Sequence, residues 1–364
     1  MPDFQKRAAI LGAGFGTRVT VPALRAEGWD VRALFSRRPE RAEAIATKLE
    51  IPHHSADAHA VLTRDDVDMV VVSTPTSTHH DMLLAALAAG KHVLCEKPLA
   101  SNRDEGRAMV EAAEASELTV MCNFEFRFSE HRLHITRLLE AGRIGRPQSA
   151  VATLHFARPM STGPLDWRSR LDMGGGALNE HCSHYFDALR GWMGEVTTVS
   201  AHVAAHETRR TDPESGATLT ADVDDFVSAT LTFESDAAAV VAMVWSERVP
   251  ASGTLHLTGT DGTISHTSPA GLFAPGPVSY TARLRQGRVA PDDAEVLPLP
   301  GNIEPLPAPE IVAASRRLLR EFERGVAEGC SPVPNLHDGL HAQAMLDAAR
   351  ESSRTGRVVE VAPR

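Results

Sequence analysis

Short apolar runs alternate with helical patterns through the first third of the chain. The first run covers residues 8–11 and passes through glycines into the helical pattern of TRVTVPALRAEG. The run in DVDMVVVSTP, residues 66–75, is uninterrupted, which is typical of a strand buried on both faces of a parallel sheet. A further short strand is indicated by KHVLCEKPLA. Strands and helices that alternate at these lengths predict a doubly wound parallel sheet.

The pattern changes near residue 125. A helical stretch at residues 132–145 is followed by strand-like alternation in QSAVATLHFA. Strands dominate from residue 196 to about 297, separated by turn signals such as GTDGT. Two helical patterns, at residues 311–329 and 336–354, close the chain. The hydrophobic pattern thus predicts an α/β first part and a second part rich in strands.

Length and charge narrow the class of protein. A chain of 364 residues exceeds one ordinary core and favours two domains. The formal charge is 37 − 47 = −10, which argues against nucleic acid or an anionic membrane as partner. No apolar run is long enough to cross a bilayer, and no signal-peptide core precedes the first strand. Four cysteines without metal-type spacing add to the expectation of a reduced, cytoplasmic protein.

The glycines after the first strand resemble a dinucleotide-binding fingerprint. Gly12 permits a tight turn, and Gly14 lets the backbone approach a pyrophosphate at a helix N-terminus. The third position of the fingerprint falls on Thr17, with Gly16 one residue early. The motif is imperfect, so an ordinary turn is the alternative interpretation.

The end of the second strand bears on the choice of nucleotide. Where a carboxylate would bind the ribose hydroxyls of NAD, the chain has Ser36, Arg37 and Arg38. A carboxylate there would repel the 2′-phosphate of NADP, whereas Ser and Arg can hydrogen-bond it. The position therefore favours NADP over NAD, and the alternative is that both arginines are simply solvated.

Ligands of doubly wound sheets bind at the carboxyl ends of the strands. Pro75, His79, Glu96, Lys97 and Pro98 fall there in this sequence. These residues are therefore candidates for a nucleotide or substrate site.

A second candidate is GGGALNEHCSHYFDAL, residues 174–189, in which three glycines run into a predicted helix. At about 100° per residue, two or three of Glu180, His181 and His184 can converge. A metal site, an acid–base centre and a solvated polar helix face are all compatible with this pattern. No fourth metal ligand is visible in the sequence.

Together these features resemble the glucose–fructose oxidoreductase / inositol dehydrogenase / rhizopine-catabolism family of NAD(P)-dependent oxidoreductases. The resemblance rests on segments in the right order along nearly the whole chain: GAGFGTRVTVPAL, STPTSTHH, EKPLA, FEFRF, DWRSRLDMGGGAL, SHYFD, VDDF, GTDGTI and AARESSRTGR. It implies an NAD(P)-binding Rossmann domain in residues 1–124. It also implies a substrate-binding and oligomerisation α+β domain in residues 125–364, with a large, open, mostly antiparallel sheet. A homodimer or homotetramer through that sheet follows from the same resemblance.

The resemblance also assigns roles to individual residues. Lys97 of the EKP motif would contact the reacting hydroxyl, and His184 would be the acid–base group, which suits an imidazole titrating near neutrality. Glu180 stands where the family has aspartate, one helical turn before His184, and would bind substrate or orient His184. Because the family transfers hydride without a metal, no metal is expected.

Three residues depart from the family pattern at this helix. Glu180 replaces an aspartate and reaches one methylene further. Cys182 replaces a glycine and narrows the pocket floor if it faces inward, and His181 replaces an apolar residue. His181 is either a substrate contact or a residue on the helix flank. These departures leave the substrate and the direction of reaction open.

The remaining site residues also follow from the resemblance. Those expected to contact the nucleotide are Gly12, Gly14, Phe15, Gly16, Thr17, Ser36, Arg37, Arg38, Thr74, Pro75, His79, Glu96, Lys97, Arg127, Trp167 and Arg168. Those expected to contact substrate are Lys97, Glu180, His181 and His184. Residues 205–216 and 268–279 read as loops that either cover a site or merely connect strands.

The predicted function is hydride transfer between NADP or NAD and a secondary hydroxyl of a sugar, cyclitol or related polyol. One alternative is a glycoside-cleaving enzyme that retains its nucleotide and uses transient oxidation and elimination, for which His181 or Glu180 would supply an added base. The other is a non-catalytic protein that senses nucleotide and regulates transcription. Lys97 and His184 argue against the regulator.

Overall fold

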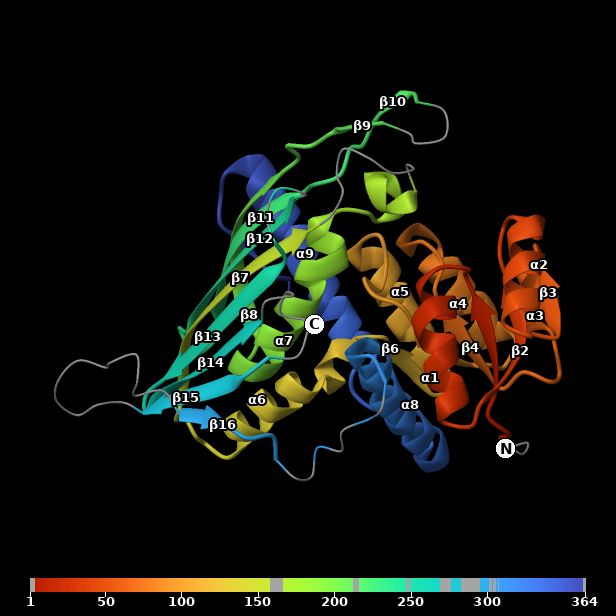
Figure 1. Cartoon of the computed structure of the whole chain (residues 1–364), viewed down its shortest axis with the longest axis horizontal. Helices are drawn as coiled ribbons and strands as arrows, with labels where there is room; N and C mark the ends of the chain where they lie inside the picture. The colour runs from red at the N-terminus through yellow and green to blue at the C-terminus, as the bar shows by residue number, and fades with distance from the viewer. Residues whose placement is uncertain are drawn as a thin grey trace. The chain divides into compact units, whose positions relative to one another are not determined.

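The computed structural model describes residues 4–157, 166–211, 216–246, 248, 250–268, 276–282, 295–300, 303, 306 and 308–362. The chain forms two compact units (Figure 1). The first contains Met1–Glu125 and Pro307–Gln343, and the second contains Phe126–Leu306 and Ala344–Arg364. None of the described helices is both long enough and apolar enough to span a membrane.

The first unit is built on a parallel sheet in the order β3-β2-β1-β4-β5-β6. Its strands are β1 (Arg7–Leu11), β2 (Asp30–Phe35), β3 (His53–Ser55), β4 (Met69–Val72), β5 (His92–Cys95) and β6 (Val120–Cys122). The helices of this part of the chain are α1 (Val21–Ala26), α2 (Pro39–Lys48), α3 (Ala58–Leu62), α4 (His79–Ala88) and α5 (Arg103–Glu114). The order of strands reverses at β1 and β4, where doubly wound sheets bind ligands. The predicted Rossmann fold is confirmed.

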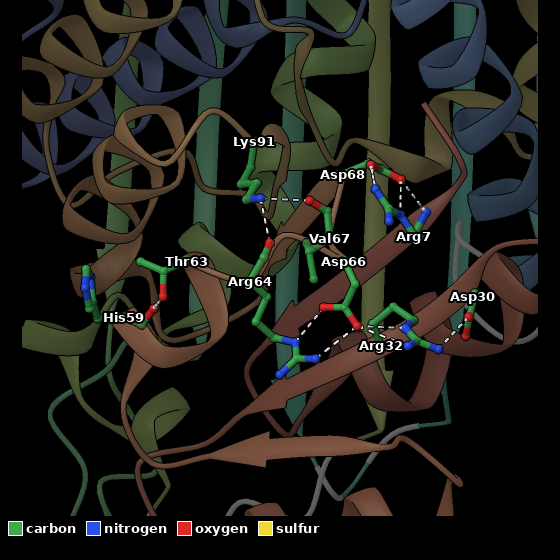
Figure 2. Close-up of polar contacts among 10 residues, drawn as sticks. All are labelled: Arg7, Asp30, Arg32, His59, Thr63, Arg64, Asp66, Val67, Asp68 and Lys91. Carbon is green, nitrogen blue, oxygen red and sulfur yellow. Dashed lines mark hydrogen bonds and ion pairs between the residues drawn. The ribbon is translucent and has the colours of Figure 1, made fainter. Parts of the chain in front are cut away.

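Ion pairs hold the amino ends of these strands, at the edge opposite the glycine turn. Figure 2 shows Asp66 between two guanidinium groups, with its carboxylate 2.7 Å from Arg64 Nε and 3.1 Å from Arg32 Nε. Arg64 precedes β4 in the sequence and Arg32 lies in β2, so this carboxylate connects two parts of the sheet. The Arg64 hydrogen bond is the main cause that lowers the pKa of Asp66 to about 2.

A second pair and a lysine complete this edge (Figure 2). Arg7, the first residue of β1, donates to both carboxylate oxygens of Asp68, at 3.0 and 2.6 Å. Lys91, just before β5, donates from Nζ to the carbonyl oxygens of Arg64 at 2.8 Å and Val67 at 2.9 Å. These contacts therefore fix the amino ends of β1, β2, β4 and β5 and do not involve the carboxyl ends of those strands.

Residues late in the chain belong to the first unit. Helix α8 (Glu310–Glu328) buries Phe322 fully and bonds to the loop before β2 through two carboxylates. Arg316 Nε lies 2.6 Å from Glu27, and Trp29 Nε1 donates to Glu323 at 2.7 Å. The sequence had assigned all of 125–364 to the second domain. These apolar and charged contacts instead group residues 307–343 with the Rossmann sheet.

The second unit is built on a sheet in the order β16-β15-β14-β13-β7-β12-β11-β8-β17 (Figure 1). Its strands are β7 (Pro147–Ala157), β8 (Val196–Ala204), β11 (Phe226–Phe233), β12 (Ala238–Ser246), β13 (Ser252–Gly259), β14 (Gly262–Ser268), β15 (Val278–Ala282), β16 (Glu295–Leu297) and β17 (Val359–Glu360). The β7–β12 pair is parallel, and the other described pairs are antiparallel. This confirms the predicted large, mostly antiparallel sheet.

Helices cover one face of this sheet. Burial alternates along β11 and β12, so one face of each strand is apolar and needs a covering layer. Helices α6 (Glu130–Glu140) and α7 (Ser183–Met193) lie against that face (Figure 1). The long helix α9 (Leu336–Thr355) begins in the first unit and ends in the second.

The segment at 205–216 is not simply a loop. It contains β9 (Arg209–Thr211), which pairs antiparallel with β10 (Thr218–Thr220). The prediction of a loop failed because that hairpin has few apolar residues to reveal its strands. Residues 212–215 of this segment, and residues 269–275 of the other predicted loop, lie outside the described residues.

Candidate active site

The glycine turn after β1 is shaped by backbone contacts. Gly12 has φ +121°, and a Cβ there would lie 2.1 Å from the carbonyl oxygen of Ser73. Its own N–H donates to the carbonyl of Phe35 at 2.9 Å. Only glycine fits this position without strain. The turn thus joins the carboxyl ends of β1, β2 and β4.

Gly14 leaves the backbone open for a ligand. No heavy atom lies within 4 Å of the position that a Cβ of Gly14 would take. Gly16 N–H donates to Ser73 Oγ at 3.0 Å, and Thr17 Oγ1 donates to the Gly14 carbonyl at 3.0 Å. The chain then enters η1 (Gly16–Thr20) and α1, and the first turn of a helix offers backbone amide groups to an anion. This arrangement fits the pyrophosphate of a dinucleotide.

The end of β2 supplies charge beside this turn. Ser36 is buried, whereas Arg37 and Arg38 are exposed. Arg41, in the first half of α2, donates from Nη2 to the carbonyl of Ala13 at 2.8 Å. Sequence reasoning missed Arg41, although its place one turn after Arg37 was a usable signal. The guanidinium groups near the turn fit a nucleotide phosphate.

His79 ties two loops at the carboxyl edge of the sheet. Its Nδ1 lies 3.0 Å from the carbonyl oxygen of Pro98, and its Nε2 lies 3.0 Å from that of Thr74. The ring is almost fully buried, and burial lowers its pKa. Thr78 Oγ1 lies within hydrogen-bond distance of the Thr74 hydroxyl, at 2.7 Å, and of the Pro75 carbonyl, at 2.8 Å. The structure thus assigns His79 contacts that hold the loops after β4 and β5 together.

The EKP loop follows β5 directly. Glu96 is buried and accepts a hydrogen bond of 2.6 Å from Asn123 Nδ2, at the end of the neighbouring strand β6. Lys97 is half-buried at the same edge of the sheet. Asn123 was missed as a functional residue, because its partner is 27 positions away and no local pattern links the two. It holds the carboxylate beside Lys97.

The catalytic helix predicted in the second unit starts at a buried carboxylate. Asp224 accepts from the backbone N–H of Leu178 at 2.6 Å, and its carbonyl accepts from Ala177 at 3.0 Å. Gly176 has φ +104°, and a Cβ there would lie 2.4 Å from Asp224 Oδ1. Burial raises the pKa of Asp224. The VDDF segment therefore has a role that sequence reasoning did not assign, which is to fix the start of this helix.

The first turn of the helix is a π-turn, η6 (Leu178–Cys182), before α7 begins. It carries Glu180, whose carboxylate lies 3.4 Å from Arg168 Nε. Arg168 also pairs with Asp166 at 3.0 Å, and its guanidinium lies 4.8 Å from the centre of the Trp167 ring. Glu180 and the Trp167–Arg168 pair, which the sequence assigned to substrate and to nucleotide, are therefore neighbours. Single π-turns of this kind are frequent at functional sites.

His181 and Cys182 face the sheet. The His181 ring stacks on Phe156 at 4.1 Å and accepts a hydrogen bond of 3.0 Å from Trp245 Nε1. Cys182 is fully buried, and its Sγ lies 3.7 Å from the sulfur of Met243 in β12. The thiol is thus part of the packing between helix and sheet.

His184 lies one turn further along, at 2 % exposure. Its ring forms a T-shaped contact with Phe126, with the ring centres 4.9 Å apart. Its backbone carbonyl accepts from Arg132 Nη1 at 3.1 Å. Arg127, which the sequence assigned to the nucleotide, forms a two-point ion pair with Asp187 of the same helix. Arg127 and Arg132 therefore both hold α7 in place.

The two units gather the candidate residues in two groups. The first unit collects the glycine turn, the Ser36 segment, His79 and the EKP loop at the carboxyl edge of its sheet. The second collects Arg168, Glu180, His181 and His184 around the start of α7. Within the described ranges, the side chains of His, Cys, Asp and Glu form no cluster of three or more able to hold a metal ion.

A parallel sheet with a glycine turn at its switch point, followed by a helix-covered open sheet, is typical of a dinucleotide-dependent oxidoreductase. The family model described as "Oxidoreductase family, NAD-binding Rossmann fold" matches residues 6–124, and that described as "GFO/IDH/MocA C-terminal domain" matches residues 132–265. The chain belongs to the GFO/IDH/MocA family of oxidoreductases. It is a dehydrogenase or reductase whose cofactor is NAD or NADP.

Relatives match along most of the chain. A D-xylose 1-dehydrogenase (NADP(+)) of Haloferax volcanii is 29% identical over 97% of this chain and 98% of that protein. An inositol 2-dehydrogenase of Saccharopolyspora erythraea is 30% identical over 74% of this chain and 77% of that protein.

Solved structures confirm the fold. Levoglucosan dehydrogenase in complex with NADH and levoglucosan superposes with a TM-score of 0.84 at 24% identity, covering 98% of this chain and 99% of that one. An oxidoreductase domain protein from Kribbella flavida gives a TM-score of 0.84 at 25% identity, with the same coverage of both chains.

Proposed function

We propose that this protein transfers a hydride between NADP and a secondary hydroxyl or ketone of a sugar, cyclitol or related polyol. The observation that carries the proposal is the start of α7, where Asp224 fixes a turn that presents Glu180 beside Arg168 and His184 one turn later. The relatives named as xylose and inositol dehydrogenases support this substrate class.

Removing a hydride from a secondary alcohol leaves a proton on its oxygen. His184 takes that proton during oxidation and returns it during reduction, because an imidazole exchanges protons near neutral pH. The Lys97 ammonium polarises the same oxygen and stabilises developing negative charge. The nicotinamide, when bound, supplies the hydride acceptor or donor. Glu180 binds a substrate hydroxyl, with its carboxylate oriented by the Arg168 guanidinium.

The preference for NADP follows from the end of β2. The buried Ser36 hydroxyl and the exposed Arg37 and Arg38 present donors where a carboxylate would select NAD. The Arg41 contact to Ala13 keeps this segment against the glycine turn. A 2′-phosphate gains charge-assisted hydrogen bonds at this position.

The outer face of the second unit's sheet is proposed as the contact between copies of the chain. Val151 and Val240 are 44% and 42% exposed on neighbouring strands, which is high for large apolar side chains. Thr153 and Thr254, on neighbouring strands of the same sheet, bond to each other through their hydroxyls at 2.6 Å. A homodimer or homotetramer covers this face, and light scattering of the purified protein measures its mass.

The protein is proposed to be cytoplasmic, because its cysteines form no disulfide bond in the described part of the chain: Cys95, Cys122, Cys182 and Cys330.

The test is turnover of nucleotide by the purified protein. Pentoses, hexoses, cyclitols, 1,6-anhydro sugars and glycosides are each supplied with NADP and with NAD, and absorbance of the reduced nicotinamide is followed. The proposal expects one substrate class to be oxidised with a higher kcat/KM for NADP. Tight nucleotide binding with no net turnover and a cleaved glycoside would contradict it.

A further inference from the structure

We propose that Trp245 holds His181 as a hydrogen-bond donor, so that His181 binds an oxygen of the substrate through Nε2 and takes no part in proton exchange. The inference rests on the proposed function, because it assigns His181 to the substrate of the same site. It makes His181 a specificity-determining residue and Trp245 a positioning residue.

The three rings are brought together by the register of the sheet. Phe156 and Trp245 are direct partners in the parallel pair β7–β12, one residue before each strand ends. The π-turn η6 places His181 over them, stacked on Phe156 at 4.1 Å with 26° between the ring planes. The Trp245 ring meets it edge-on at 5.3 Å and 84°. The imidazole is therefore held by a stacking contact with Phe156 and a T-shaped contact with Trp245.

The hydrogen bond between Trp245 and His181 decides which ring nitrogen carries the proton. An indole N–H can only donate, so the nitrogen 3.0 Å from it, His181 Nδ1, must present a lone pair. A neutral imidazole has one N–H, which then belongs to Nε2. A second proton would set two N–H groups against each other across this 3.0 Å contact. His181 is thus kept neutral and donating.

This arrangement gives the two histidines of the helix different roles, proton exchange at His184 and substrate binding at His181. His184, on the next turn, packs against the ring of Phe126, and its backbone carbonyl accepts from Arg132. A donor at His181 recognises a hydroxyl or carbonyl oxygen on a carbon near the reacting one. A site built to hydrogen-bond such an oxygen discriminates against the deoxy analogue that lacks it. It also gives elimination chemistry no extra base at position 181.

Two substitutions of His181 separate a donor from a base. In His181→Gln the amide nitrogen keeps an N–H near the place of Nε2 but cannot take up a proton, and in His181→Phe the ring is kept without any N–H. We expect KM for the substrate to rise about tenfold or more in the Phe variant, with a smaller change in kcat. The Gln variant should return KM to within a few-fold of the wild type, with an unchanged pH profile of kcat/KM. A Gln variant as impaired as the Phe variant, with one limb of the pH profile lost, would overturn the proposal.

The state of the ring can be read without any turnover. Nitrogen-15 NMR of protein labelled at histidine reports both ring nitrogens, and the His181 signals are those missing from the Gln variant. We expect a protonated Nε2 and an unprotonated Nδ1 in the wild type at neutral pH. In Trp245→Phe, which lacks the indole donor, the proton should no longer be confined to Nε2. Trp192→Phe is the matched control, because it removes an indole N–H bonded to Thr136 at 3.0 Å, away from His181.

The two measurements fail in different ways. If no substrate is turned over by the wild type, the proposed function fails, while the NMR result still stands. A proton on Nδ1 of His181 in the wild type would overturn the inference whatever the kinetics.

Discussion

The turn after β1 and the start of α7 hold their groups by different means. At the turn the backbone itself sets the geometry: Gly12 donates to the Phe35 carbonyl, and the site of a Gly14 Cβ is open. At α7 the contacts are made by distant side chains, with Asp224 at the helix start and Trp245 at His181. A nucleotide phosphate can be held by amides alone, whereas a substrate must be recognised by particular side chains. The first region is therefore expected to tolerate few residue types, and the second to vary with the substrate.

The largest effect is expected at α7. His184→Ala should lower kcat by about a thousandfold or more, because proton transfer loses its acceptor. Nucleotide affinity, measured by the fluorescence of the reduced cofactor, should stay within twofold. His202→Ala is the control, since that histidine lies on β8, a strand that carries no proposed site residue. Unchanged turnover in the His184 variant would remove it from the mechanism.

The glycine turn offers a matched pair of substitutions. Gly14→Ala should weaken nucleotide binding by tenfold or more without changing the melting temperature, since its Cβ meets nothing in the protein itself. Gly12→Ala should destabilise the fold by about 2 kcal/mol or more, because its Cβ would lie 2.1 Å from the Ser73 carbonyl oxygen. Calorimetry and nucleotide titration of both variants test this. Equal melting temperatures would show that the turn does not depend on the Gly12 backbone geometry.

The choice of nucleotide should respond to one residue. Ser36→Asp introduces a carboxylate at the end of β2 and should raise KM for NADP on the order of 10- to 100-fold, with KM for NAD lowered or unchanged. Initial rates with each nucleotide at a fixed substrate concentration give the ratio. Ser55→Asp, on the neighbouring strand β3, is the control, because it adds the same charge beside Ser36 without replacing it. A change in both nucleotides alike would argue against a 2′-phosphate contact at Ser36.

The smallest effect is expected at the opposite edge of the Rossmann sheet. Asp66 has a pKa lowered to about 2, chiefly by Arg64, so its folded-state pKa lies below the unfolded value of about 3.9. Its stabilisation is present above about pH 4 and is lost as the pH falls towards 2. Asp66→Asn should cost under about 1 kcal/mol at pH 7, because solvent screens these partly exposed groups. Denaturant unfolding at pH 7 and pH 3 checks this, with the 91% exposed Asp104 replaced by Asn as control.

Much of the fold could be predicted because its signals are local. The uninterrupted apolar run at β4 and the glycines after β1 each lie within about ten residues and depend on backbone rules. The grouping of residues 307–343 with the first unit could not be predicted, because it rests on contacts such as Arg316 with Glu27, which are 289 positions apart. An amphipathic pattern shows that α8 buries one face, but it does not show which other element that face packs against.

The candidate site also combines features that local sequence predicts with features that depend on distant contacts. Lys97 and His184 could be named from motifs, while their assigned roles stay predictions. The π-turn at Leu178–Cys182, the Asp224 contact and the Trp245 bond to His181 could not be foreseen. Each depends on which residue of one element meets which residue of another, and hydrophobic periodicity carries no information on such pairs.

The most direct test measures turnover and nucleotide affinity together in the wild type, His184→Ala and Gly14→Ala, using the substrate class found in the panel. We predict that the histidine variant binds NADP normally and turns over more slowly by about a thousandfold or more. The glycine variant should need more NADP and reach near-normal kcat once saturated. If both variants lose both properties to the same extent, the nucleotide turn and the catalytic helix do not have the separate roles described here.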